Sequence, residues 1–131
     1  LGVEFPSISD NGGAGGSILL TGASSGIGRA TCGYLAEQHP NVTIYCGIRI
    51  SNPFDAAAKD YPFTLPNVRA VHLDVTNQTQ VEAAMVRIME KEEEASHPMI
   101  GIVCNAGIAE LGTLEYQSLE VIERHYQVNV L

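Results

Sequence analysis

The sequence predicts an α/β fold, in which a doubly wound parallel sheet carries helices on both faces. Two observations lead to this fold class. Short apolar runs that suit buried strands alternate with helical periods from Ser17 onwards. The last of these runs, 99–104, is apolar throughout, which is typical of a strand covered on both faces. Right-handed crossovers through the helices would place such strands parallel in one open sheet.

The first half of the chain predicts a strand, a helix and two more strands. A strand at 18–20 runs into Thr21-Gly22, and strands follow at 42–48 and 68–73. The intervening segment 50–66 holds three prolines and is expected to be a loop with a short helical piece at 56–58. The helix between the first two strands ends before His39-Pro40, because proline disfavours helix in the residue ahead of it. Its predicted buried stripe consists of Ile27, Ala30, Thr31, Tyr34 and Leu35.

The second half predicts a helix, a strand and a last helix. The acidic run 91–94 is expected to be the solvated end of the first of these helices, and 99–104 is the strand. The apolar positions of the two helices are Val81, Ala84, Met85, Ile88 and Met89, then Leu119, Ile122, Tyr126 and Val130. The predicted order is therefore β-α-β-β-α-β-α.

Domain organisation follows from the same pattern. Residues 1–16 hold a glycine-rich run and are expected to be a flexible leader. Residues 17–131 are expected to form the N-terminal part of a single dinucleotide-binding domain, because the chain stops inside a helical pattern. The fold is thus predicted to be incomplete, lacking its C-terminal half.

Composition excludes several classes of function. The 131 residues carry a formal charge of −8, which disfavours sequence-independent binding to nucleic acid. Cys32, Cys46 and Cys104 lack the spacing of a disulfide framework or a metal site, so they are expected to be small buried hydrophobes in a reducing compartment. No apolar run reaches the ~20 residues that span a bilayer, and no secretory signal is present. These features predict a cytoplasmic protein without a metal.

The turn after the first strand carries the chemistry. Gly22 allows a sharp turn, Gly26 allows a pyrophosphate to approach the main chain, and Gly28 allows helix and strand to pack closely. Ser24 and Ser25 add hydroxyl donors beside the helix N-terminus. Because this turn follows an apolar strand and opens an amphipathic helix, it predicts a dinucleotide site in a Rossmann-type sheet. The alternative is a plain structural turn.

The glycine spacing makes the pattern more specific. Thr-Gly-x-x-x-Gly-x-Gly resembles the motif of the short-chain dehydrogenase/reductase family, and three more motifs of that family follow in order: Leu73-Asp74-Val75, Asn105-Ala106-Gly107, and Asn129 within Val128-Asn129-Val130. The run from Ile44 to Arg49 looks most like the 17beta-hydroxysteroid and retinol dehydrogenase branch of the family.

The resemblance implies roles that each have an alternative. Asp74 and Val75 would address an adenine, although Asp74 could instead cap a turn. Asn105 to Gly107 would line the ribose and brace the central sheet, or form a strand-ending turn. Asn129 would be the catalytic asparagine that bends a helix and holds a water in the proton relay, whereas spacing alone suggests a helix-surface amide. The predicted cofactor-binding residues are Gly22, Ser24, Ser25, Gly26, Ile27, Gly28, Arg49, Asp74, Val75, Asn105, Ala106 and Gly107.

Arg49 indicates which cofactor is used. The end of the second strand is where the adenosine ribose of a dinucleotide docks, and a carboxylate there would bind a free 2′-hydroxyl. The segment 47–51 has none, and its guanidinium can pair with a 2′-phosphate, so NADP(H) is favoured over NAD(H). The alternative is an exposed arginine without a ligand.

The family's active-site set is missing from the chain. None of the five tyrosines is followed by lysine four residues later, so no Tyr-x-x-x-Lys occurs. The resemblance therefore implies an NAD(P)-dependent oxidoreductase acting on a small-molecule alcohol or carbonyl, with this chain as the cofactor-binding half and inactive alone. By analogy with the family's sheet order, the four strands would lie in the order 3-2-1-4 and leave the fourth strand as an unpaired apolar edge. The complete protein is expected to be a homo-oligomer. The alternative is a non-catalytic nucleotide-binding or scaffolding protein with the same fold.

Overall fold

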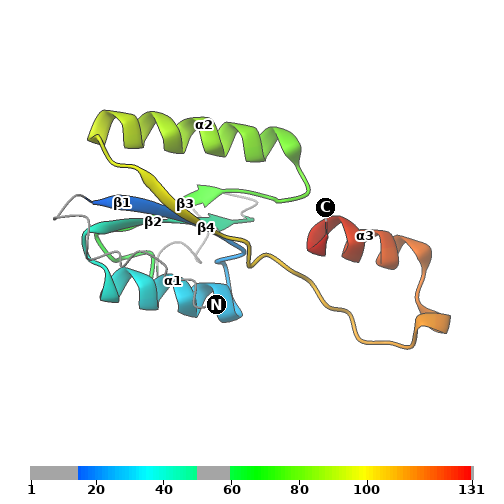
Figure 1. The fold of residues 1–131 in the computed structure, drawn as a ribbon. Helices are drawn as coiled ribbons and strands as arrows, with labels where there is room; N and C mark the ends of the chain where they lie inside the picture. Colours follow the sequence, from blue (N-terminus) through cyan, green and yellow to red (C-terminus); the bar gives the residue numbers. More distant parts are fainter. Residues whose placement is uncertain (1–14, 50–59, 131) are drawn as a thin grey trace, which may run out of the picture.

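Four parallel strands form the centre of the structure. The computed structural model describes residues 15–49 and 60–130 (Figure 1). The sheet has the order β3-β2-β1-β4, which confirms the predicted fold class and strand order. Its strands are β1 (Gly16–Thr21), β2 (Val42–Ile48), β3 (Val68–His72) and β4 (Met99–Val103). The bounds of β2 are those predicted from the sequence, and β1 begins one residue inside the predicted leader.

Helices cover the two faces of this sheet. Figure 1 shows α1 (Gly26–Gln38) and α2 (Gln78–Ala95) on opposite faces, and α3 (Leu119–Asn129) beside the layered body. A short 3₁₀ helix, η3 (Leu114–Tyr116), precedes α3. The α1 helix ends ahead of His39-Pro40, as predicted. The Asn77 side chain caps α2 by accepting a hydrogen bond from the Gln80 N–H at 3.1 Å.

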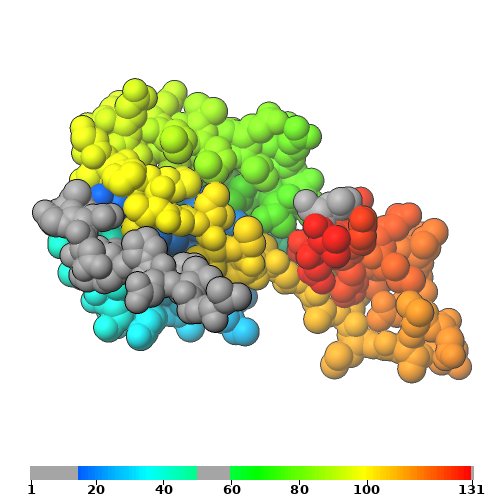
Figure 2. All heavy atoms as spheres, viewed as in Figure 1, coloured from blue at the N-terminus to red at the C-terminus, as the bar shows by residue number. Residues whose placement is uncertain are grey.

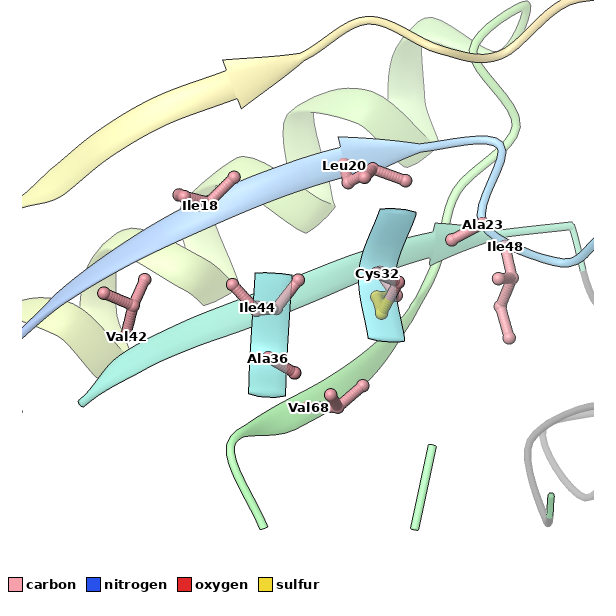
Figure 3. Packing of buried hydrophobic residues seen from close by; sticks show 10 residues of the cluster. Ile18, Leu20, Ala23, Cys32, Ala36, Val42, Ile44, Ile48 and Val68 are labelled. Atoms are coloured by element: carbon pink, nitrogen blue, oxygen red, sulfur yellow. A yellow bond between two sulfur atoms is a disulfide. The ribbon is translucent and has the colours of Figure 1, made fainter. Parts of the chain in front are cut away.

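Alternating strand residues build two cores. The core shared with α1 contains Ile18 and Leu20 of β1, Ile44 of β2 and Cys32 of α1 (Figure 3). The core shared with α2 contains Leu19, Tyr45, Val71, Leu73, Ala84 and Ile88. This alternation is the period of two that strand geometry imposes, with both faces covered.

The predicted buried stripe of α1 is wrong at three of its five positions, whereas Leu35 is half-buried and packs against the core shared with α1. Ile27 and Tyr34 are 79% and 64% exposed, and Ala30 is exposed as well. The buried residues are instead the small ones, Gly28, Cys32, Gly33 and Ala36. Small side chains let a helix lie close to a sheet, so the contact face follows residue size rather than hydrophobicity.

The prediction for the cysteines needs two corrections. Cys32 and Cys46 are buried as expected, but they form a disulfide that joins α1 to β2 across a sequence separation of 14 residues. Cys104 is a free thiol and is exposed rather than buried. Sequence spacing could not reveal the pair, because it forms only when α1 crosses the middle of β2.

Glu92 corrects the prediction of a fully solvated end for α2. It is 4% exposed, and its carboxylate accepts a hydrogen bond of 2.7 Å from the Tyr45 hydroxyl on β2. Met89, predicted for the buried face, is 51% exposed. Burial, followed by the hydrogen bond to Glu92, raises the pKa of Tyr45 to about 12.

The raised pKa of Tyr45 predicts a loss of stability at high pH. The folded state favours the protonated phenol, so this contribution is complete below about pH 10 and is lost as the pH rises toward about 12. The free energy of unfolding should fall by roughly 2–3 kcal/mol over that range. Urea unfolding at a series of pH values would measure it, with Tyr45→Phe as the variant that lacks this component. Parallel pH profiles for the two proteins would contradict the prediction.

The C-terminal part packs loosely. No residue of α3 is buried, and its predicted apolar positions Leu119, Ile122, Tyr126 and Val130 are all exposed. Ile100 and Ile102 of β4, at the edge of the described sheet, are exposed too. The prediction of an unpaired apolar edge is therefore confirmed for the described residues. Figure 2 shows the C-terminal segment, in orange and red, as a lobe beside the body.

Some predictions concern residues outside the described ranges. Most of the leader and the helical piece at 56–58 lie outside them. Within 15–49 and 60–130, no helix is long and apolar enough to cross a membrane. In the same ranges, no three His, Cys, Asp or Glu side chains come together in a way that could hold a metal ion.

Candidate functional site

The carboxyl ends of the parallel strands meet at one edge of the sheet, where the structure has a cavity of about 430 Å³. All twelve residues predicted to bind a cofactor line it. They come from four places in the chain: the turn after β1 with the start of α1, Arg49 after β2, 74–75 after β3, and 105–107 after β4. Leu73, Ile108 and Val128 also line the cavity. Ligands of open α/β sheets bind in this position.

The glycines of the first turn do different jobs. A side chain at Gly22 would lie 2.7 Å from the Ala106 Cα, and one at Gly28 would lie 2.3 Å from the Gly22 carbonyl oxygen. Gly22 and Gly26 have positive φ values of 70° and 54°. At Gly26, however, nothing lies within 4 Å of the position that a Cβ would take. Gly22 and Gly28 are therefore needed for packing, whereas Gly26 leaves open space at the cavity.

The start of α1 is suited to an anion. Ser25 occupies the N-cap position, but its hydroxyl makes no capping hydrogen bond. The first N–H groups of a helix have no partner within the helix and carry the positive end of the helix dipole. Ser25 is exposed and Ser24 is half-buried, and both line the cavity. The N–H groups and hydroxyls can thus donate to a phosphate.

Thr21 links the first turn to the end of β4. Its hydroxyl oxygen accepts hydrogen bonds from the N–H groups of Asn105 at 3.1 Å and Ala106 at 3.0 Å. The Asn105 side-chain amide donates to the carbonyl oxygens of Thr21 at 3.0 Å and Gly22 at 3.3 Å. Asn105 therefore braces the sheet, as the resemblance implied. Sequence reasoning missed Thr21 as a site residue, although it opens the glycine motif.

Asp74 caps its own turn while facing the cavity. Its Oδ1 accepts hydrogen bonds from the N–H and the hydroxyl of Thr76, at 2.9 and 2.7 Å. The Thr76 hydroxyl is the main cause that lowers the pKa of the Asp74 carboxyl, and the charges of Arg49 and His72 lower it further. The capping role suggested as the alternative is present, and Asp74 lines the cavity as well.

Arg49 lies exposed on the wall of the cavity. Among residues 15–49 and 60–130, no carboxylate forms an ion pair with it. In a chain of charge −8, it places a guanidinium beside the first turn and Asp74. This cation can pair with an anionic group of a ligand.

Asn129 is the last residue of α3 and lies outside the cavity wall. Its side chain binds the peptide groups of Ile108, accepting from the N–H at 2.9 Å and donating to the carbonyl oxygen at 2.9 Å. It is exposed, but it is not a free helix-surface amide. Asn129 thereby joins α3 to the segment that follows β4.

The cavity as a whole suits an elongated anion. It runs across the sheet edge from Arg49 and Asp74 on the β2 and β3 side, past the N-terminus of α1, to Asn105–Ile108 after β4. The N-terminus of α1, with its positive dipole end, lies at the middle of the cavity, and the guanidinium of Arg49 lies at one end.

Comparisons with known proteins agree with this geometry. Residues 17–131 match the family described as short chain dehydrogenase. The chain is 29% identical over 118 residues to mouse mitochondrial D-beta-hydroxybutyrate dehydrogenase, covering 89% of this chain and 34% of that protein. It is 32% identical over 96 residues to human retinol dehydrogenase 13, covering 72% and 27%. The chain thus spans about a third of the length of these relatives.

Solved structures show the same fold. Chicken fatty-liver carbonyl reductase with bound NADPH superposes with a TM-score of 0.75 at 26% identity, covering 87% of this chain and 45% of that one. The 3-ketoacyl-(acyl-carrier-protein) reductase of Brucella melitensis, complexed with NADH, superposes with a TM-score of 0.72 at 25% identity, covering 88% and 44%.

Proposed function

The chain belongs to the short chain dehydrogenase family, and we propose from this that it is the cofactor-binding part of an NAD(P)-dependent oxidoreductase. The reaction would interconvert an alcohol and a carbonyl, with the cofactor carrying the hydride. One observation carries the proposal: twelve residues chosen from sequence motifs line a single cavity at the carboxyl ends of the strands.

The residues of the cavity fit a dinucleotide. The open space at Gly26, beside the N–H groups of α1, takes the pyrophosphate, and Ser24 and Ser25 add hydroxyl donors. Asp74 and Val75 face the adenosine. Asn105, Ala106 and Gly107 line the ribose on the β4 side, where the nicotinamide lies. This assignment follows the order of the strands, because β4 and β3 flank the pyrophosphate position on opposite sides.

NADP(H) is the cofactor that these residues favour. Arg49 is exposed at the adenosine end, and its guanidinium can make a bidentate, charge-assisted contact with the 2′-phosphate. NADH would leave this cation without a phosphate partner. Among the solved relatives, the carbonyl reductase is described as NADPH-bound and the ketoacyl reductase as complexed with NADH, so both nucleotides occur in the family.

Asn129 is proposed to act in proton transfer in the complete enzyme, as the family resemblance implies. Its Oδ1 accepts one hydrogen bond from Ile108 and keeps a second lone pair for a water. The substrate is proposed to be a small alcohol or carbonyl compound. A homo-oligomeric state and a cytoplasmic location stay predictions, and three relatives are named as mitochondrial.

Cofactor titration tests the proposal. NADP⁺ and NADPH should quench tyrosine fluorescence or give a calorimetric signal with saturable binding, and adenosine 2′,5′-bisphosphate should compete. Absence of binding by NADP(H) and NAD(H) would contradict the proposal. Saturable binding without alcohol oxidation by the full-length protein would favour the non-catalytic, nucleotide-binding alternative.

A further inference from the structure

The segment 108–110 is held against α3 by a set of hydrogen bonds, and the proposed function uses only those between Asn129 and Ile108. The Glu110 N–H donates to Nε2 of His125 at 2.9 Å, and the Glu110 carbonyl oxygen accepts from the Gln117 amide at 3.2 Å. The Glu110 carboxylate pairs with Arg124. With the two bonds between Asn129 and Ile108, four contacts fix this three-residue segment to α3, and the fifth fixes it to Gln117, which precedes the helix.

These contacts define the protonation state of His125. Its Nδ1 lies 2.7 Å from the Val121 carbonyl oxygen, which can only accept, so Nδ1 carries the proton. Its Nε2 accepts a hydrogen bond from the Glu110 N–H and therefore carries no proton. The neutral ring therefore satisfies both partners. A doubly protonated ring would point an N–H at the N–H of Glu110, and that hydrogen bond would be lost.

The position of α3 depends strongly on the hydrogen bond between His125 and Glu110. No residue of α3 is buried and three are half-buried, Val121, His125 and Val128, so apolar burial contributes little to the position of the helix and polar contacts contribute more. His125 and Asn129 are four residues apart and share one face of α3. They hold peptide groups two residues apart, at Ile108 and Glu110. Ile108 and Val128 belong to the cavity wall, so a shift of this face would move that wall.

We propose that His125 is a positioning residue for the cofactor site, holding the segment 108–110 and α3 so that the β4 side of the cavity accepts the nicotinamide end of NADP. This inference rests on the proposed function. It is confined to one end of the cavity, because Arg49 and Asp74 lie on the β2 and β3 side and have no contact with α3 among the described hydrogen bonds. The charged groups that meet at the contact are Glu110 and Arg124, which pair with each other.

Two probes separate the two ends of the cavity. NADP⁺ reaches the β4 side, whereas adenosine 2′,5′-bisphosphate carries the same 2′-phosphate and lacks the nicotinamide. His125→Phe keeps a ring and removes both hydrogen bonds. Loss of the hydrogen bond to Glu110 should weaken NADP⁺ binding by roughly threefold to tenfold, the worth of one hydrogen bond between neutral groups, and leave the binding of adenosine 2′,5′-bisphosphate unchanged. His125→Gln keeps an acceptor, so it should bind NADP⁺ within about threefold of the parent.

The ratio of the two dissociation constants, NADP⁺ over adenosine 2′,5′-bisphosphate, is a readout that a merely structural role would not move. It should rise in His125→Phe and stay near the parent value in His125→Gln. His97→Phe is the matched control, since His97 is also half-exposed but lies ahead of β4, away from the cavity.

The outcomes are distinguishable. Equal weakening of both probes in His125→Phe would mean a general loss of structure and would overturn the inference, as would unchanged NADP⁺ binding. Circular dichroism of each variant checks the fold. If the parent protein binds neither probe, the proposed function fails, and the inference falls with it.

Discussion

Replacing Arg49 by aspartate is expected to reverse or abolish the preference for NADPH over NADH. Arg49 lies on the wall of the cavity without an ion-pair partner among the described residues. The substitution removes a charge-assisted pair with the 2′-phosphate and adds repulsion between two anions. The two effects together should change the preference by roughly 2–4 kcal/mol, which is about 30-fold to 700-fold in the ratio of dissociation constants. Titration of both cofactors with parent and variant measures that ratio.

The control for Arg49→Asp is Arg87→Asp. It makes the same charge reversal on α2 at an exposed position that does not line the cavity. If both variants weaken NADPH binding equally, the cause is the overall negative charge of the protein and not a local contact of Arg49. Equal dissociation constants for NADPH and NADH in the parent would refute the assignment of Arg49.

Gly26→Val should remove dinucleotide binding while most of the fold remains. Nothing lies within 4 Å of the Cβ position at residue 26, so the valine side chain would extend into the cavity where the pyrophosphate is proposed to lie. Its positive φ of 54° costs a branched residue roughly 1–2 kcal/mol. Loss of the charge-assisted hydrogen bonds to phosphate should weaken binding by at least about 100-fold. Cofactor titration and circular dichroism on the same sample give both quantities.

Three further variants separate the possible causes. Gly26→Asn tolerates the positive φ and still fills the space, so it should lose binding with less loss of stability. Gly28→Ala would place its Cβ 2.3 Å from the Gly22 carbonyl oxygen and should cost stability first, by about 1–3 kcal/mol. The Cβ of Gly101→Ala would contact only Ile18, at 3.9 Å, so this variant should change neither cofactor binding nor stability. Unchanged cofactor binding in Gly26→Val would mean that the turn is only structural.

The predictable features depend on local patterns. The apolar run 42–48 coincides with β2, because a strand covered on both faces needs apolar residues throughout. The cavity wall was also predictable, since parallel strands bring their carboxyl ends to one edge and the motifs directly follow those ends.

The features that sequence reasoning missed depend on contacts between distant elements. The buried face of α1 is set by close contacts with distant elements, since Gly28 lies against the Gly22 carbonyl oxygen and Cys32 is bonded to Cys46 of β2. Glu92 is buried because Tyr45, distant in sequence, supplies a hydrogen bond. Similarly, nothing near His125 in the sequence shows that the Glu110 N–H would donate to it.

The absence of buried residues in α3 has a consequence for hydrogen exchange. Backbone amides of β1 and β2, buried between two cores, should exchange only when the whole domain unfolds. Amides of α3 should exchange through a separate, low-energy opening that leaves the sheet intact, since breaking a few exposed hydrogen bonds releases the helix. The protein would then have at least two cooperative units. A bound dinucleotide that contacts the wall at Ile108 and Val128 would slow exchange in α3 far more than in the sheet.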